Sequence, residues 1–310
     1  MSRTRSLILT GALLTATTAV TACGAGNAAT GDGKPAVMAA FYPLQWISQQ
    51  VGGADVSVTG LTKPGTEPHD LELTARQVAD IQDSTLVVYI KGVQPAVDEA
   101  VDGHASDSAF DAATAISTLP ATGADEGHRE QGHGDDHADV SYDPHIWLDP
   151  SRFATVATRL GDQLAKADPA HAAAYKQRAA TTAAALTTLD GEYRKGLATC
   201  TGRAIVTSHA AFGYLANRYG LEQISVSGID PETEPSPTRL AEVANVAKQK
   251  NVTTIFTEEL VSPKVAEILA KEVGAKTAVL NPIESAPGDG DYLSAARRNL
   301  ETLRTALGCS

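Results

Sequence analysis

The sequence predicts an α/β protein with two lobes, each built on a parallel sheet flanked by helices. Three observations lead to this fold class. Short β-rich runs alternate with amphipathic helical stretches in both halves of the chain, a pattern typical of a parallel sheet covered by helices. An Ala-rich stretch with almost no strand signal separates the halves. Finally, 310 residues exceed what one hydrophobic core usually serves, so we expect two domains of ordinary size.

The predicted elements follow this alternation along the chain. In the first half we expect strands at 36–41, 56–59 and 85–90, with helices near 43–51, 74–82 and 94–101. In the second half we expect strands at 204–207, 223–226, 253–256 and 277–280, with helices near 210–219, 237–249, 263–273 and 292–306. Strands separated by helices in this way give parallel neighbours.

A long rigid connection is predicted between the lobes. Residues 150–167 and 169–195 are Ala-rich and have helical spacing. Asp168-Pro169 is typical of a cap followed by Pro at the first helical position. A helix of about 27 residues would span roughly 40 Å, which makes a stiff connection. The mature chain therefore divides into an N-terminal lobe at 35–149, connecting helices at 150–196 and a C-terminal lobe at 197–310.

The N-terminus has the features of a targeting segment. Arg3 and Arg5 precede an apolar run that is too short to span a membrane, and the run ends in Val20-Thr21-Ala22-Cys23. This ending resembles a bacterial lipobox, so we expect a signal peptide at 1–22 and lipidation of Cys23. The alternative is an ordinary secretory signal, with Cys23 incidental. Residues 23–34 then form a flexible tether, and the protein is extracytoplasmic and anchored to the cell membrane.

Charge restricts the class of partner. The chain has 25 Lys and Arg against 37 Asp and Glu, a formal net charge of −12, which argues against nucleic acid because phosphate binding needs clustered positive charge. A cation ligand fits this balance better, although an acidic soluble surface would also produce it.

Two further cysteines can pair in an oxidising compartment. Cys200 and Cys309 would close a loop of about 109 residues, and such a bridge would contribute roughly 4 kcal/mol in the chain-entropy model. The alternative is two separate buried thiols.

Residues 120–142 break the alternation of strands and helices. This segment holds Gly, Asp, Glu and three histidines with almost no apolar residue, so we expect a mobile loop. His-rich tracts of this kind are typical metal binders, which makes His128, His133 and His137 candidates for a secondary site. The alternative is a solvated acidic loop.

Three histidines outside this segment indicate a metal site more specifically. His69 follows the second predicted strand and a turn, His145 precedes the first connecting helix, and His209 lies at the end of a predicted strand. Ligands of open α/β sheets bind outside the carboxyl ends of the strands, so the three side chains can converge on one cleft. Each alone is more often a hydrogen-bonded structural residue. Together they supply most of a tetrahedral shell for a zinc-like ion.

Four stretches resemble the metal-binding receptors of bacterial ABC importers for zinc and manganese. They occur in family order and cover essentially all of the chain from residue 35 onward. The stretches are Pro64-Gly65-Thr66-Glu67-Pro68-His69-Asp70, Asp143-Pro144-His145-Ile146-Trp147-Leu148-Asp149-Pro150, Ser208-His209-Ala210-Ala211-Phe212-Gly213-Tyr214-Leu215 and Gly228-Ile229-Asp230-Pro231-Glu232-Thr233-Glu234-Pro235-Ser236-Pro237.

This resemblance implies metal bound between two lobes, with His69, His145 and His209 as its ligands. It implies a zinc-binding receptor that delivers zinc to a membrane permease, reaches the membrane through its lipid anchor and has no enzymatic activity; we expect it to be a monomer. An acidic His-rich loop before His145 is typical of the zinc branch of the family.

The fourth ligand departs from the family pattern. Family members usually place Asp where the last strand ends, and this sequence has Leu280-Asn281-Pro282 there. An amide oxygen is a weaker donor for a dication than a carboxylate. Asn281, Glu67, Glu258 or water are therefore candidates for the fourth position, and Glu258 could equally be a partner that orients a histidine.

Three other functions remain alternatives. A manganese receptor of the same family is less favoured, because manganese prefers oxygen-rich sites whereas three imidazoles suit zinc. A secreted zinc hydrolase would also use three histidines, but the sequence has no His-Glu-x-x-His pairing. An adhesin or structural surface protein would share the anchor but gives no reason for three imidazoles at loop ends.

Overall fold

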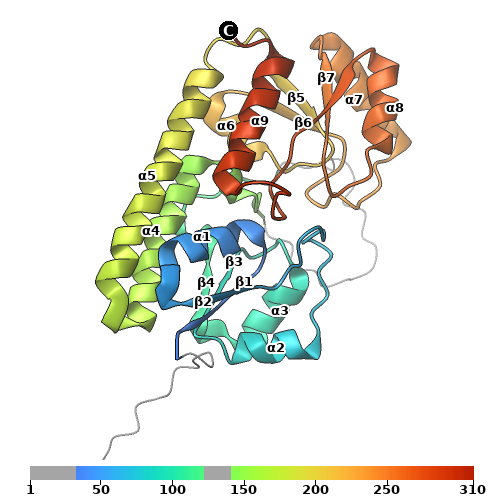
Figure 1. The fold of residues 1–310 in the computed structure, drawn as a ribbon. Coiled ribbons are helices and arrows are strands. Elements are labelled where there is room, and N and C mark those ends of the chain that lie inside the picture. The colour runs from blue at the N-terminus through green and yellow to red at the C-terminus, as the bar shows by residue number, and fades with distance from the viewer. Residues whose placement is uncertain (1–32, 122–140) are drawn as a thin grey trace, which may run out of the picture.

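The computed structural model describes residues 33–121 and 141–310 (Figure 1). The predicted signal peptide, Cys23, most of the expected tether, and His128, His133 and His137 lie outside these residues. The described part forms two lobes, each with a four-stranded parallel sheet and flanking helices. The predicted fold class is confirmed.

The N-terminal lobe contains the sheet with strand order β2-β1-β3-β4. Its strands are β1 (Ala36–Ala39), β2 (Ser57–Gly60), β3 (Leu86–Tyr89) and β4 (Ala109–Asp111), and its helices are α1 (Tyr42–Gly52), α2 (Ala75–Gln82) and α3 (Pro95–His104). Every residue of β3 is buried, as expected of a central parallel strand. The sequence analysis missed β4, whose three residues include a single fully buried one, Phe110.

The C-terminal lobe repeats this topology with strand order β6-β5-β7-β8. Its strands are β5 (Ala204–Thr207), β6 (Glu222–Ser225), β7 (Thr254–Thr257) and β8 (Lys276–Val279), and its helices are α6 (Gly213–Tyr219), α7 (Pro237–Gln249), α8 (Lys264–Val273) and α9 (Tyr292–Leu307). All pairings are parallel, so in each lobe the strands end at one edge of the sheet, where ligands bind in open α/β folds.

Two long helices, α4 (Pro150–Ala167) and α5 (Ala172–Gly196), connect the lobes and lie side by side (Figure 1). The predicted long helix is present, although the residues Pro169–His171 form a 3₁₀ turn before α5 begins. The 25 residues of α5 span roughly 37 Å. The pair packs closely at Gly161, where an added Cβ would lie 2.6 Å from the Cβ of Ala179.

Helix α5 is bonded to both lobes. Near its beginning, the guanidinium of Arg178 donates to the carbonyl oxygens of Val51 and Gly52 at 2.9 and 2.7 Å, satisfying the end of α1. Near its end, the hydroxyl of Tyr193 donates to the carbonyl oxygen of Ala296 in α9 at 2.5 Å. Helix α5 is therefore a rigid connection that is hydrogen-bonded to both lobes.

Aromatic side chains also join the lobes directly. Trp46 of α1 stacks on Tyr292 of α9 with ring centroids 4.8 Å apart, and Phe153 of α4 lies 5.1 Å from the same Tyr292 ring. The indole Nε1 of Trp147 donates to the carbonyl oxygen of Pro282 at 2.7 Å. These buried contacts place the loop after β8 against the N-terminal lobe, in position to contribute to an interlobe site.

A disulfide joins Cys200 to Cys309, as predicted. It ties the end of α9 to the segment between α5 and β5 and closes a loop of 109 residues. Since Cys200 precedes β5 and His209 follows it, the bridge lies at the end of the strand opposite to the histidine.

Replacing both cysteines by serine should therefore destabilise the protein without changing its affinity for metal. We expect the free energy of unfolding to fall by about 2–5 kcal/mol, the usual effect of removing a native disulfide. Urea denaturation of the parent and the double variant, each with and without metal, would measure this. A large loss of metal affinity at 25 °C in the folded variant would contradict the separation of bridge and site.

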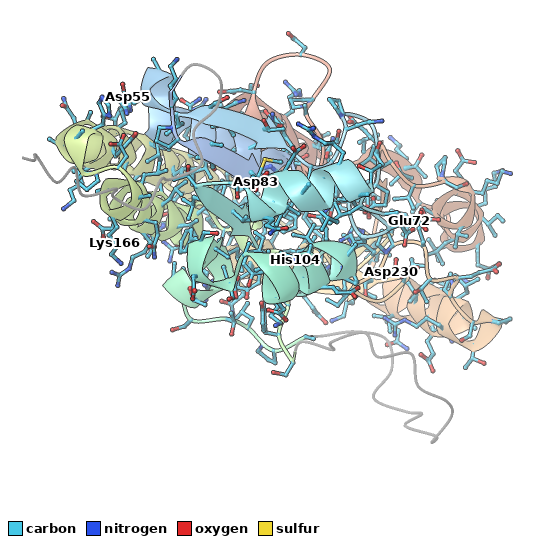
Figure 2. The ribbon with its side chains drawn as sticks, turned by 90° about the horizontal axis from the view of Figure 1, so that it is seen from below. Asp55, Glu72, Asp83, His104, Lys166 and Asp230 are labelled. Carbon is cyan, nitrogen blue, oxygen red and sulfur yellow. A yellow bond between two sulfur atoms is a disulfide. The ribbon has the colours of Figure 1, made fainter. Side chains whose placement is uncertain are left out.

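Charged side chains such as Glu72, Asp83 and Lys166 lie on the outside of the molecule (Figure 2). Among residues 33–121 and 141–310, none of the helices combines the length and the apolarity that crossing a bilayer requires.

Candidate metal centre

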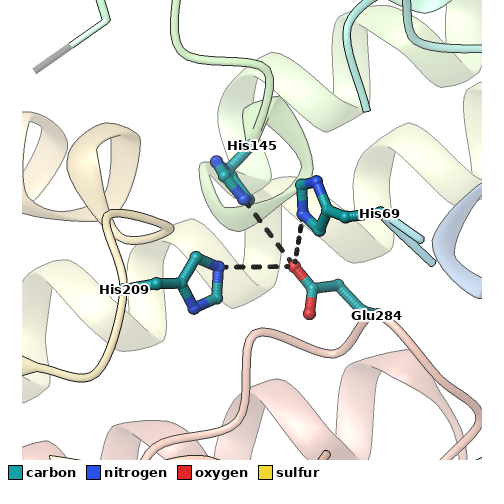
Figure 3. Close-up of side chains that lie close together, drawn as sticks. All are labelled: His69, His145, His209 and Glu284. Carbon is teal, nitrogen blue, oxygen red and sulfur yellow. Dashed lines mark ion pairs between the residues drawn. The ribbon is translucent and has the colours of Figure 1, made fainter. Parts of the chain in front are cut away.

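Three histidines and one glutamate converge between the lobes (Figure 3). The Nε2 atoms of His69, His145 and His209 lie 3.6, 3.7 and 3.7 Å from the Oε1 atom of Glu284. One ligand atom from each of the four residues lies within 4.8 Å of the others. The three histidines that the sequence analysis singled out are thus brought together.

The cluster is buried, and its inward atoms have no hydrogen-bond partner among the described residues. His145 and His209 are 0% exposed, Glu284 1% and His69 9%. The three Nε2 atoms and the Glu284 Oε1 atom make no hydrogen bond within the described part of the chain. Buried polar atoms in native proteins are almost always paired, so four unpaired atoms facing one point indicate a missing partner.

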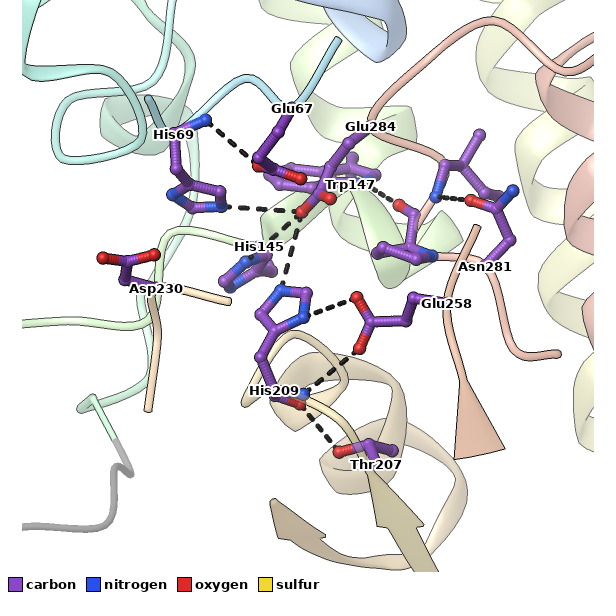
Figure 4. Close-up of polar contacts among 12 residues, drawn as sticks. Glu67, His69, His145, Trp147, Thr207, His209, Asp230, Glu258, Asn281 and Glu284 are labelled. Atoms are coloured by element: carbon purple, nitrogen blue, oxygen red, sulfur yellow. Dashed lines mark hydrogen bonds and ion pairs between the residues drawn. The ribbon is translucent and has the colours of Figure 1, made fainter. Parts of the chain in front are cut away.

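His69 is placed by a tight turn after β2. The carboxylate Oε1 of Glu67 accepts the backbone N–H of His69 at 3.1 Å, and the N–H of Leu71 donates to the carbonyl oxygen of Pro68. This Pro-rich turn fixes the backbone on both sides of the histidine, which directs the ring into the space between the lobes (Figure 4).

His145 is oriented by a carboxylate two residues earlier. The Oδ1 atom of Asp143 lies 2.8 Å from Nδ1 of His145 and accepts its backbone N–H at 2.9 Å. The buried 3₁₀ helix Ile146–Leu148 follows directly and anchors the segment in the core. Because the carboxylate accepts a hydrogen bond from Nδ1–H, the lone pair of Nε2 is left for the cluster.

His209 is held in the same way by Glu258, which follows β7. The Oε2 atom of Glu258 lies 2.7 Å from Nδ1 of His209, and its Oε1 atom accepts the backbone N–H of His209 at 3.1 Å (Figure 4). The hydroxyl of Thr207 also donates to the His209 carbonyl oxygen at 2.7 Å. Ring and backbone are therefore both fixed.

Glu284 is presented by an unusual turn after β8. Ile283 has φ +62°, a left-handed conformation that is strained for a β-branched residue. The side-chain oxygen of Asn281 supports this turn by accepting the Ile283 N–H at 2.6 Å, and Asn299 of α9 bonds both backbone groups of Asn281. This backbone points Glu284 toward the three histidines.

The structure brings a residue other than the sequence-based candidates to the three histidines. The side-chain oxygen of Asn281 accepts the N–H of Ile283, and its amide nitrogen donates to Glu259 at 2.6 Å. Glu258 orients His209, the alternative role considered for it, and Glu67 is not among the four converging groups. Glu284, three residues beyond Asn281, is the fourth member of the cluster. No local sequence pattern singled out Glu284, because its direction depends on the backbone of Ile283 and the side chain of Asn281.

Burial and carboxylates oppose each other in setting the histidine pKa values. Burial lowers the pKa of His209, but Glu258 and Glu284 outweigh this effect and raise the pKa well above its usual value. Burial also lowers the pKa of His69, and here Glu284 and Glu67 outweigh it, so this pKa is raised as well. For His145 burial prevails over Asp143, so its pKa is lowered.

The pKa values of the two glutamates beside the histidines, Glu284 and Glu67, are shifted in opposite directions. Burial raises the pKa of Glu284, but His209 and His69 reverse the effect and hold its pKa below the usual value. Burial and the nearby Glu284 raise the pKa of Glu67 to about 7. Two neighbouring carboxylates repel each other when both are ionised, so a bound dication would stabilise the ionised form of both.

The spacing of the four atoms suits one small dication. A tetrahedron with metal–ligand distances of about 2.0–2.2 Å has edges of about 3.3–3.6 Å, close to the three Nε2–Oε1 distances of 3.6, 3.7 and 3.7 Å, and all four atoms lie within 4.8 Å of one another. The fold and this cluster define a two-lobed binding protein with a candidate metal site between its lobes.

Comparison with known proteins gives the family. A family model described as zinc-uptake complex component A, periplasmic, matches residues 37–306. The chain belongs to this family.

Individual relatives agree with the family. The chain is 36% identical over 295 residues to zinc-binding protein AdcA of Streptococcus pyogenes serotype M3, covering 88% of this chain and 56% of that protein. It thus spans about half the length of the curated relatives it first matches. It is 34% identical to the high-affinity zinc uptake system protein ZnuA of Bacillus subtilis, with 93% of each covered.

A solved structure shares the fold. The laminin-binding protein Lmb of Streptococcus agalactiae, described as bifunctional with adhesin and metal transporting activity, superposes with a TM-score of 0.77 at 33% identity. The match covers 88% of this chain and 99% of that one.

Proposed function

We propose that the protein is an extracytoplasmic receptor that binds zinc with high affinity and delivers it to the permease of an ABC importer. Four converging buried atoms, none of which has a hydrogen-bond partner in the described part of the chain, carry this proposal. The relatives named as zinc-binding and zinc-uptake proteins support it. His69, His145, His209 and Glu284 would hold the ion as transported cargo.

Zinc fits this donor set better than manganese. Three imidazole nitrogens and one carboxylate oxygen form a typical tetrahedral zinc shell, whereas manganese prefers more oxygen ligands and a larger coordination number. Four protein donors also leave no open position for water, which a zinc hydrolase needs. Membership of a family of binding components further favours a receptor over an enzyme.

The lipobox at Val20-Thr21-Ala22-Cys23 supports anchoring at the outer face of the membrane through Cys23, and a relative from Streptococcus pneumoniae is named a zinc-binding lipoprotein. A single two-lobed chain holds the complete cluster, which supports a monomeric receptor.

Growth of cells without the protein in zinc-depleted medium tests this function. The parent chain should restore growth, whereas a His209→Ala chain present at the same surface abundance should not. Equal rescue by both chains would contradict the proposal.

The acidic His-rich segment should bind additional zinc weakly through His128, His133 and His137. The sequence predicts a mobile polar loop here, and ordering such a loop on binding would cost conformational entropy and lower the affinity per site. Deleting residues 125–139 should lower the zinc stoichiometry and leave the tight site and the melting temperature of the zinc-free form nearly unchanged. Calorimetric titration of both forms measures this, and loss of the tight site on deletion would show that the segment supplies a primary ligand.

A further inference from the structure

We infer that Gly213 is a positioning residue for metal binding, acting from the C-terminal lobe on His145 through Asp143. The inference rests on the proposed function and concerns the glycine of the Ser208–Leu215 stretch. Gly213 is the first residue of α6, and a Cβ built on it would lie 2.4 Å from the Oδ2 atom of Asp143. Real Cβ atoms do not approach an oxygen this closely, so any side chain here displaces the carboxylate.

The backbone of Gly213 does not by itself require glycine. Its φ lies outside the left-handed region, unlike Gly220 at the other end of the same helix. Alanine also favours a helix more than glycine does. The contact with Asp143 is therefore the feature that opposes a side chain at this position.

Neither chain segment can easily move away to relieve the contact. The N–H of Asp143 donates to the carbonyl oxygen of Leu119 at 2.9 Å, and the N–H of Leu119 donates to the hydroxyl of Tyr214, the next residue of α6, at 3.0 Å. The guanidinium of Arg152 lies over the Tyr214 ring, 4.9 Å from its centroid. Helix α6 and the Asp143 backbone are thus held together, and the carboxylate has to rotate.

Rotation of this carboxylate would release His145. The other oxygen, Oδ1, holds both Nδ1 and the backbone N–H of His145, at 2.8 and 2.9 Å. Without these contacts the ring can rotate, and the proton is no longer held on Nδ1. Changes to partners that orient a metal-bound histidine typically weaken metal binding by about 10–100-fold.

A double-mutant cycle tests the inference, with zinc affinity measured by competition with a chromophoric chelator. Gly213→Ala should weaken zinc binding about 10–100-fold while the melting temperature of the zinc-free protein stays within a few degrees of the parent. In an Asp143→Ala background the same change should have no further effect. Gly191→Ala is the matched control, because a Cβ at that helical position meets nothing within 4 Å.

Two results would overturn the inference. One is an unchanged zinc affinity in Gly213→Ala. The other is an equal loss in the parent and Asp143→Ala backgrounds, which would mean that Gly213 acts by another route. Weak binding by the parent itself would instead count against the proposed function, so the two failures are distinguishable.

Discussion

Replacing any one of His69, His145, His209 or Glu284 by alanine is expected to weaken zinc binding by more than about 100-fold. Residues that only orient a ligand cost about 10–100-fold when changed, so removing a donor from a shell of four has to cost more. The loss should be greatest for His145 and His209, whose rings are completely buried and fixed by carboxylates. Competition titration with a chelator of known affinity measures each variant.

Asn281→Asp provides the contrasting variant. An aspartate oxygen can still accept the N–H of Ile283 and keep the turn that presents Glu284, although the bond to the exposed Glu259 is lost. We therefore expect its zinc affinity to stay within about tenfold of the parent, far above that of Glu284→Ala. Tightened zinc binding in Asn281→Asp together with unchanged binding in Glu284→Ala would return the fourth position to residue 281.

Zinc affinity is expected to fall steeply as the pH decreases through the neutral range. The pKa of His209 is raised well above its usual value and that of His69 is also raised, so protons compete with zinc for these imidazoles at a higher pH than for a free imidazole. Zinc must displace those protons, because only the deprotonated ring coordinates. With two such groups protonated, the affinity should fall by up to about 100-fold per pH unit.

The other two donors should add little to this pH dependence. The pKa values of His145 and Glu284 are both lowered, so each is already deprotonated near neutral pH. Calorimetry at pH 7 in buffers with different ionisation enthalpies would count the protons released, and we expect a net release of protons on zinc binding. An affinity that is constant between pH 6 and 8, with no proton release, would contradict the assignment of His69 and His209.

The fold could be predicted from sequence because its signals are local and repeated. Seven of the eight described strands are runs of β-forming residues separated by amphipathic helices, and the Asp168-Pro169 pair marks the beginning of the second connecting segment. β4 was missed because three residues with one fully buried side chain carry no periodicity. Its pairing with β3 is formed by tertiary packing and not by a local preference.

The site could be predicted only where its residues follow strand ends or stand in recognisable turns. His69, His145 and His209 met that condition. Glu284 did not, because its inward direction depends on the left-handed backbone of Ile283, on Asn281 and Asn299, and on Trp147 from the other lobe. The Trp147 contact joins residues 135 positions apart, so no short sequence window contains all of these contacts.

X-ray absorption spectroscopy at the zinc edge tests the central claim most directly, using the mature protein without residues 125–139 and loaded with one equivalent of zinc. The proposed site predicts a four-coordinate shell with three imidazole nitrogens and one oxygen at about 2.0–2.2 Å, reduced to two imidazoles in His209→Ala. A six-coordinate oxygen shell, or a parent spectrum that His209→Ala leaves unchanged, would contradict it.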